Sequence, residues 1–277
     1  MEDPRSIRTI GDFLNQVCSA KQKIQELVEA NNEIEEENKE TIGWYFRGQA
    51  SDRWELLPGL FRTVPNICEQ RACLNGFKST LFGEEQFLIQ ELERYVPEAF
   101  VLCRNDVSRL AVAQHYGIPT RLLDVSENAL VALYFAVADE KHIDQDGMVF
   151  VFRTSADQYK VASTGGCVDW KIQRYHTDVR PISSRPILIF PPLMTARQKA
   201  QSGAFFLFEN DSLGQPIVES LNEFGRIAIP AGCKKSIRKE FEDSFRWFPH
   251  TLFPDNIDLY REHLIKDAEK RVIANLS

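Results

Sequence analysis

Apolar residues recur at nearly helical spacing in the N-terminal part of the chain. Between residues 10 and 40 they are Phe13, Leu14, Val17, Ile24, Leu27, Val28 and Ile34. Steps of three and four residues place such side chains on one face of a helix. We therefore predict an amphipathic helix over residues 10–40. The acidic run at its end, residues 33–40, is typical of a solvated helix face or a helix–strand junction; a role in protein interaction is the alternative.

Shorter apolar runs predict strands. The aromatic segment from Trp44 to Arg47 indicates a short strand that ends at Gly48. Similar runs bounded by turn residues predict further strands at 120–125, 148–152, 187–190, 204–208 and 226–229. Residues 154–184 show weak periodicity and predict an insertion or lid-like loop.

The remaining periodic segments predict helices at 84–103, 107–116, 127–139, 195–201, 234–245 and 255–274. Asp106 is a good N-cap for the second of these, and Gly117 suits the position after its end. The first should bury Phe87, Leu88, Leu92, Tyr95 and Phe100. Ser126 can cap the helix at 127–139, which is apolar nearly all round over residues 129–136 and should be the most buried.

Helices and strands alternate without a linker that would divide the chain. We expect an α+β fold, a single mixed domain with a central β-sheet and flanking helices. The N-terminal amphipathic helix, residues 1–40, should pack with the remainder, residues 41–277, as one compact unit.

Composition narrows the functional classes. With 277 residues and 43% hydrophobic content the chain can bury a full core. Its net charge of −7 argues against a general nucleic-acid surface. No apolar run is long enough for a membrane span, and residues 1–5 lack the apolar region of a secretory signal. Six scattered cysteines without a CxxC pair suit a reducing compartment, so we expect a cytoplasmic protein without a membrane role.

Several standard sites are absent from the sequence. There is no GxxxxGK[ST] loop, no GxGxxG after a strand, no HExxH and no GxSxG. The five histidines show no zinc-ligand spacing, so we expect no metal. No cysteine lies in a recognisable reactive context.

Polar residues concentrate instead at predicted strand and helix ends. The candidate binding or catalytic residues are Arg47, Gln49, Gln114, His115, Arg121, Asp124, Ser126, Arg197 and Gln201. Each also has an architectural interpretation, such as an ion pair between Arg47 and Asp124 or a helix cap at His115 or Asp124. Arg121 and Asp124 are three residues apart on a predicted strand and should face opposite ways. If the others share one cleft, arginine forks and amides suit a phosphate-bearing ligand.

A set of motifs spans most of the chain. They are Phe46-Arg47-Gly48-Gln49, the segment 57–62, the block from Gln114 to Asp124, the apolar helix 129–136, Arg197, the segment 201–205 and residues 252–254. With these motifs the chain resembles the FRG domain family, named for its Phe-Arg-Gly motif.

Three short segments are also similar in order to the ADP-ribosyltransferases. Arg47-Gly48 resembles the early-strand arginine of those enzymes, and Ser126 with helix 129–136 resembles their middle element. Gln201 stands where they carry a glutamate; Glu127 and Glu209 are candidate replacements. This resemblance implies an ADP-ribosyltransferase-like fold in which Arg47 holds phosphate and ribose, Ser126 supports Arg47, and His115 and Gln201 orient the nucleotide.

The leading hypothesis is a pocket that binds NAD or a related nucleotide, with NAD as substrate if the domain is an ADP-ribosyltransferase or NAD glycohydrolase. One alternative is non-catalytic recognition of a nucleotide or nucleic-acid end, in a bacterial or phage conflict system. Another is a protein-interaction domain that works through residues 10–40. The first hypothesis requires Arg47, His115, Asp124 and Gln201 to line one cleft.

Overall fold

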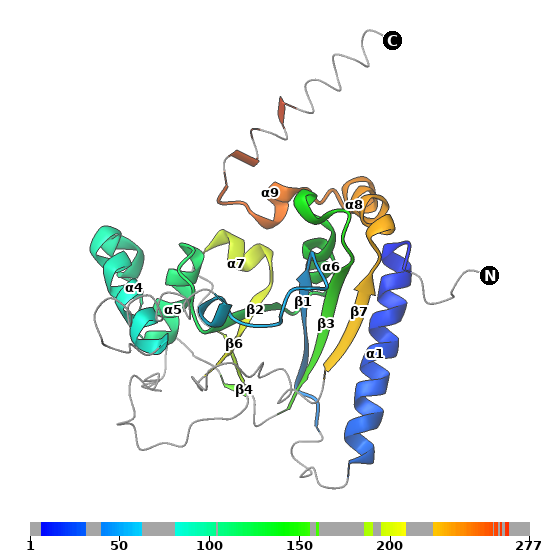
Figure 1. Ribbon diagram of the computed structural model, residues 1–277, viewed down its shortest axis with the longest axis horizontal. Helices are drawn as coiled ribbons and strands as arrows, with labels where there is room; N and C mark the ends of the chain where they lie inside the picture. The colour runs from blue at the N-terminus through cyan, green and yellow to red at the C-terminus, as the bar shows by residue number, and fades with distance from the viewer. Residues whose placement is uncertain are drawn as a thin grey trace, which may run out of the picture.

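A seven-stranded sheet organises the chain in the computed structural model (Figure 1). The structure describes residues 7–31, 40–62, 81–103, 105–155, 159–160, 186–190, 195–208, 224–256, 258–259, 261 and 264–265. The strands are β1 (Gly43–Gln49), β2 (Leu122–Ser126), β3 (Gly147–Thr154), β4 (Tyr159–Lys160), β5 (Ile187–Ile189), β6 (Gly203–Leu207) and β7 (Phe224–Ile229). Their order in the sheet is β4-β5-β6-β2-β1-β3-β7, antiparallel throughout except for the parallel pair of β4 and β5.

Helices cover the sheet and extend beyond it. They are α1 (Ile10–Ala30), α4 (Leu81–Tyr95), α5 (Asp106–His115), α6 (Ala129–Val137), α7 (Ala196–Ala200), α8 (Ala231–Phe245) and α9 (Pro249–Leu252), with 3-10 turns η1 (Pro97–Phe100) and η2 (Glu140–His142). In Figure 1, α1 runs along β7 at one side of the molecule, and α4 and α5 form a lobe at the other. The predicted α+β fold with one central sheet is confirmed.

The sheet is nearly split between β1 and β2. Strand β1 pairs with β3 along all of its residues, from Gly43 to Gln49. In the described structure its register with β2 is a single pair, Phe46 with Ser126. The sheet therefore consists of two strand groups, β4-β5-β6-β2 and β1-β3-β7, joined at one point.

Helix α6 is the buried centre of the fold. Leu133 and Ala136 have no exposed surface, and Tyr134 is 1% exposed. These side chains share a core cluster with Val149 on β3 and Ile237 on α8. The prediction that this apolar helix is largely buried is confirmed. Its N-cap, however, is Asn128, whose side chain accepts the Leu130 N–H at 2.9 Å, so the expected Ser126 cap is wrong.

Gly48 continues β1 instead of ending it, which corrects the sequence prediction. A Cβ atom placed on Gly48 would lie 1.7 Å from the carbonyl oxygen of Ala132 on α6. No side chain fits that space. The glycine is therefore needed because helix α6 lies directly against the strand.

The N-terminal helix ends earlier than predicted. Helix α1 begins after the Thr9 cap, whose hydroxyl accepts the Asp12 N–H, and it ends at Ala30. Residues 32–39, including Ile34 and most of the acidic run, lie outside the described residues. Of the predicted apolar face, Phe13, Val17, Ile24 and Val28 are buried, whereas Leu14 and Leu27 are exposed.

The region predicted as one helix over 84–103 is divided. Helix α4 ends at Tyr95 and the turn η1 begins at Pro97, because proline has no N–H to continue the helix. The predicted inner residues Phe87 and Tyr95 are exposed. Glu84 and Glu85 are buried on α4 instead. The expected inner face is therefore wrong at Phe87 and Tyr95, whereas Phe100 is buried and Leu92 packs against the core as predicted.

Other predicted elements agree in kind and differ at their ends. Helix α5 is capped by Asn105 rather than Asp106, because the Asn105 side chain accepts the Ser108 N–H at 2.8 Å. Gly117 follows the helix with φ of +84°, as expected for its position. Most of the predicted loop at 154–184 and of the predicted helix at 255–274 lies outside the described residues.

A buried lysine ties α8 to two other segments. The Nζ atom of Lys234 donates to the carbonyl oxygens of Ala50 at 2.6 Å and His142 at 2.9 Å. Burial lowers the pKa of Lys234, with Asp146, Asp139 and Asp52 opposing the shift. This contact holds the chain that follows β1 against η2 and α8.

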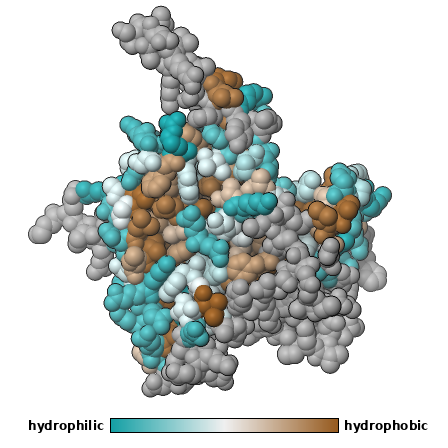
Figure 2. Space-filling view, turned by 180° about the vertical axis from the view of Figure 1, so that it is seen from behind, coloured by the Kyte–Doolittle hydropathy of each residue, from teal (hydrophilic) through white to brown (hydrophobic). Residues whose placement is uncertain are grey.

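The surface carries several separate apolar patches. Figure 2 shows one of them on the lobe that contains α4 and α5. The exposed apolar residues of this lobe include Tyr95, Val101 and Leu102. No helix in the described part of the chain is both long and apolar enough to cross a bilayer.

Candidate functional site

A cleft of about 280 Å³ lies where β1 and β2 separate. Its walls come from α5, α6, α7 and the strands β1, β2 and β6. The structure brings seven of the nine candidate residues into its lining: Arg47, Gln114, His115, Asp124, Ser126, Arg197 and Gln201. The four residues required by the single-cleft hypothesis are all among them.

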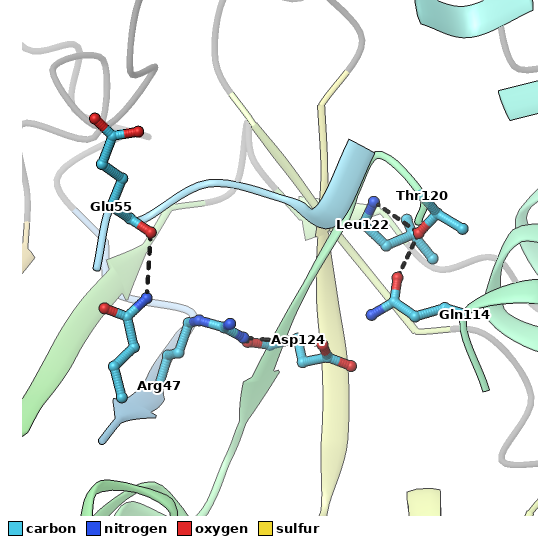
Figure 3. A network of polar contacts seen from close by, with 7 residues as sticks. Arg47, Glu55, Gln114, Thr120, Leu122 and Asp124 are labelled. Atoms are coloured by element: carbon cyan, nitrogen blue, oxygen red, sulfur yellow. Dashed lines mark hydrogen bonds and ion pairs between the residues drawn. The ribbon is translucent and has the colours of Figure 1, made fainter. Parts of the chain in front are cut away.

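Arg47 reaches across the split in the sheet. Its Nη1 atom donates to the carbonyl oxygen of Asp124 at 2.8 Å and lies 3.8 Å from Oδ2 of the same residue (Figure 3). The Nε atom is buried and has no hydrogen-bond partner in the described structure. Burial lowers the pKa of Arg47, and the Asp124 charge opposes this shift. An arginine nevertheless stays protonated, so the cleft contains a fixed cation.

Asp124 supplies negative charge at the mouth of the cleft. It is the exposed position of β2, whose other residues are all buried, and its side chain is 63% exposed. Among the described residues that line the cleft, it is the one carboxylate. Because the side chain is well solvated, the 3.8 Å ion pair contributes little to stability.

Helix α5 contributes Gln114 and His115 near its end. The Gln114 Oε1 atom accepts a hydrogen bond from Thr120 Oγ1, which itself accepts the Leu122 N–H at 3.2 Å (Figure 3). This contact fixes the Gln114 amide against the start of β2. His115 packs edge-on against Tyr116, with ring centroids 5.6 Å apart. Both residues thus present polar groups from the α5 wall.

Ser126 and Gln201 are bonded to each other and to the C-terminal part of the chain. The Ser126 hydroxyl donates to the Gln201 carbonyl oxygen at 2.7 Å and accepts the Asn128 N–H at 3.0 Å. The Gln201 Nε2 atom donates to the Leu252 carbonyl oxygen at 2.9 Å. Ser126 therefore fixes the turn between α7 and β6, while Asp124 provides the support of Arg47 that was expected from Ser126.

Arg197 is a second cation in the lining. Its guanidinium carbon lies 4.7 Å from the centre of the Phe253 ring, and its backbone N–H donates to Asp255 Oδ2 at 3.4 Å. The side chain is half-buried. Together with Arg47, it makes the interior of the cleft cationic although the whole chain is acidic.

Two candidates lie elsewhere. Gln49 is buried and does not line the cleft, and its Nε2 atom makes a long contact of 3.5 Å with the Glu55 carbonyl oxygen. Arg121 precedes β2 and forms a buried ion pair with Glu85, with Nε at 2.6 Å from Oε2. Its guanidinium also lies 3.3 Å from the centre of the Phe82 ring. Arg121 thus connects α4 to the sheet, and it does not share a cleft with Asp124, in line with their expected opposite directions.

The sequence did not single out the aromatic walls of the cleft. Phe46, Phe135 and Phe205 line it. All three lie in segments that carry the family motifs, but none of them was named as a candidate site residue. Phe135 is half-buried on α6 between fully buried neighbours, a difference that only the fold shows. In the described part of the chain, no group of three or more histidine, cysteine or acidic side chains could hold a metal ion.

Comparison with known proteins agrees with the motif analysis up to the apolar helix 129–136, whereas Arg197 and the segments 201–205 and 252–254 lie outside the matched residues. Residues 43–145 match the family model of the FRG domain. No curated protein and no solved structure matches the chain. The matched segment contains the Phe46-Arg47-Gly48 motif and both partners of the contact between Arg47 and Asp124. Residues 43–145 of the chain therefore form an FRG domain.

Proposed function

We propose that the cleft binds NAD or a related phosphate-bearing nucleotide. The observation that carries this proposal is the Arg47 guanidinium, which the Asp124 carbonyl oxygen holds in the lining of a cavity that also contains Arg197. A guanidinium presents N–H groups in a planar fork that matches phosphate oxygens. Because one bond already fixes Arg47, little side-chain freedom is lost when an anion binds.

The other walls suit the rest of a nucleotide. Phe46, Phe135 and Phe205 offer apolar and aromatic surface on which a base can pack. The amide nitrogen of Gln114 can donate to a ribose or base acceptor, since Thr120 bonds only the amide oxygen. The volume of about 280 Å³ is near the lower end of ligand pockets, which span roughly 300–1,000 Å³. One nucleotide half would fill it, and the other half of NAD would extend past the exposed Asp124.

Turnover of NAD, by ADP-ribosyl transfer or hydrolysis, requires negative charge near the ribose to stabilise an oxocarbenium-like centre. Asp124 is the carboxylate that the described lining provides for this role. Gln201, where the transferases carry a glutamate, is neutral.

Recognition without turnover is a second candidate function. It is favoured by the Gln201 amide, which is engaged with the Leu252 carbonyl oxygen. A site that binds the nucleotide and leaves it intact would act as a sensor. Both candidates share the same binding step and differ only in the fate of the ligand.

Calorimetric titration of the full chain with NAD and with ADP-ribose tests the binding step. Chromatography of the NAD mixture then measures released nicotinamide. Binding with release supports an NAD-consuming enzyme, whereas binding with intact NAD supports the sensor. If neither NAD nor ADP-ribose binds, the proposal is wrong.

A further inference from the structure

The C-terminal turn at residues 252–255 contacts two walls of the cleft. From this turn, the Leu252 carbonyl oxygen accepts the Gln201 amide at 2.9 Å, and Asp255 Oδ2 accepts the Arg197 backbone N–H at 3.4 Å. The Phe253 ring lies 5.7 Å from that of Phe135, at an interplanar angle of 88°. Gln201, Arg197 and Phe135 all line the cleft.

The turn is itself firmly held. Leu252 is 1% exposed and belongs to the same core cluster as α6. Phe253 packs against that cluster, and the edge-to-face contact with Phe135 sets the orientation of its ring. Core packing therefore fixes the position of this turn.

Phe253 is well placed to orient the Arg197 guanidinium. No ion pair to Arg197 is found among the described residues, while its guanidinium carbon is 4.7 Å from the Phe253 ring centre. A cation over an aromatic face is attracted without using its N–H groups. An ion pair would occupy those N–H groups, whereas the ring leaves them available to a phosphate.

We infer that Phe253 is a positioning residue that holds Arg197 for phosphate binding, so that the C-terminal turn completes the ligand site. This inference rests on the proposed binding of a phosphate-bearing nucleotide. It extends the site beyond the family-matched segment, since Arg197 and Phe253 both follow residue 145. The FRG segment supplies Arg47, and the later part of the chain supplies and positions the second cation.

A double-mutant cycle on the full chain tests the inference with ADP-ribose as the probe. Phe253→Leu removes the aromatic face and should weaken binding about 3- to 10-fold, the effect of losing a partly exposed cation–π contact. Phe253→Tyr retains the face and should bind within about 2-fold of the wild type. In an Arg197→Ala background, where no cation is left for the ring to hold, Phe253→Leu should weaken binding by less than a further factor of about 2.

Each outcome has a defined meaning. Unchanged affinity in Phe253→Leu, or an equal loss with and without Arg197, overturns the inference and leaves the proposed function intact. A wild-type protein that binds neither ADP-ribose nor NAD overturns both. Melting temperatures show whether the variants fold. If Phe253→Leu does not, Phe253→Met, which is also non-aromatic but more flexible, takes its place in the cycle.

Discussion

Arg47 donates a hydrogen bond to the carbonyl oxygen of Asp124 at the point where β1 leaves β2. If the register of Phe46 with Ser126 continued, Gly48 would stand opposite Asp124, but no such pair forms. The guanidinium bridges the opening that results. One residue thus links the two strand groups of the sheet and lines the cleft between them.

Gly48→Ala should severely destabilise the protein. A Cβ atom there would meet the Ala132 carbonyl oxygen at 1.7 Å, and the atoms involved are backbone, so strand and helix would have to move apart. We expect a loss of about 3 kcal/mol or more in the free energy of unfolding, at the upper end of single substitutions. Urea denaturation measures it.

Gly232→Ala in α8 is the matched control for that substitution. A Cβ atom at Gly232 meets no other atom within 4 Å. Because alanine is the better helix former, this variant should be as stable as the wild type or more stable by about 0.5–1 kcal/mol. Similar losses in both variants would mean that α6 does not lie against β1 as described.

Leu133→Ala tests the buried centre of the fold. Leu133 has no exposed surface and lies in the core cluster around α6. Its truncation should cost about 2–5 kcal/mol of unfolding free energy. Leu130→Ala, at a partly buried position of the same helix, should cost less. A change below about 1 kcal/mol at Leu133 would place α6 at the surface.

The sequence predicted these core features well because they depend on periodicity. The apolar run of α6 and the strands β1, β2, β3, β5, β6 and β7 appeared near where they were expected, whereas the short β4 lies in the segment 154–184 that was predicted to be a loop. The errors arose where a tertiary contact overrides local preference. Gly48 has the signature of a strand end, yet it lies within β1 because α6 leaves no room for a side chain.

The burial of charged side chains was less predictable, because it too depends on tertiary contacts. Glu85 lies in a helix whose inner face was predicted from its apolar residues, but it is buried because Arg121 pairs with it from another element. Arg121 and Asp124 lie in one sequence block, and only the fold shows that one pairs with α4 while the other lines the cleft. The sequence block could therefore indicate that a cleft is present. It could not show which polar residues of the block face that cleft.

Glu85→Gln tests whether its partner Arg121 stabilises the fold or contributes to ligand binding. It leaves Arg121 buried without its charge partner, which should cost about 3–5 kcal/mol of unfolding free energy. Glu91→Gln is the control, because Glu91 pairs with the exposed Arg94 and should cost less than about 1 kcal/mol. At a temperature where both variants are folded, ADP-ribose affinity should equal that of the wild type. Weaker binding by folded Glu85→Gln would show that Arg121 contributes to the site.

Lys234 predicts a pH dependence of stability. Burial lowers its pKa in the folded protein below the usual value of about 10.4, so the unfolded chain binds the proton more tightly. The cost of burying the charge is fully present below the folded pKa and is relieved as the pH rises toward the unfolded value. The stability of the wild type relative to Lys234→Met should therefore increase between about pH 7 and pH 10. Urea denaturation of both proteins across this range measures the difference, and a flat or falling difference contradicts the prediction.

Arg47 can serve the ligand or the sheet, and a paired experiment distinguishes the two. Arg47→Lys retains the charge but not the planar fork. If the fork grips phosphate, this variant should bind ADP-ribose at least about 10-fold more weakly, or 1.4 kcal/mol. Arg226→Lys on β7 is the control, since Arg226 is exposed and does not line the cleft, and its affinity should be unchanged.

The stability of the Arg47 variants completes the argument. Asp124 is 63% exposed, so Arg47→Ala does not strand a buried carboxylate, and the main loss is the hydrogen bond to the Asp124 carbonyl oxygen. That loss should cost about 1–3 kcal/mol of unfolding free energy, and Arg47→Lys should cost less. Thermal melts and ADP-ribose titrations of the same samples provide both quantities. A large drop in melting temperature with unchanged affinity per folded molecule would assign Arg47 to the sheet alone. A folded Arg47→Lys protein that binds poorly would assign its guanidinium to the ligand.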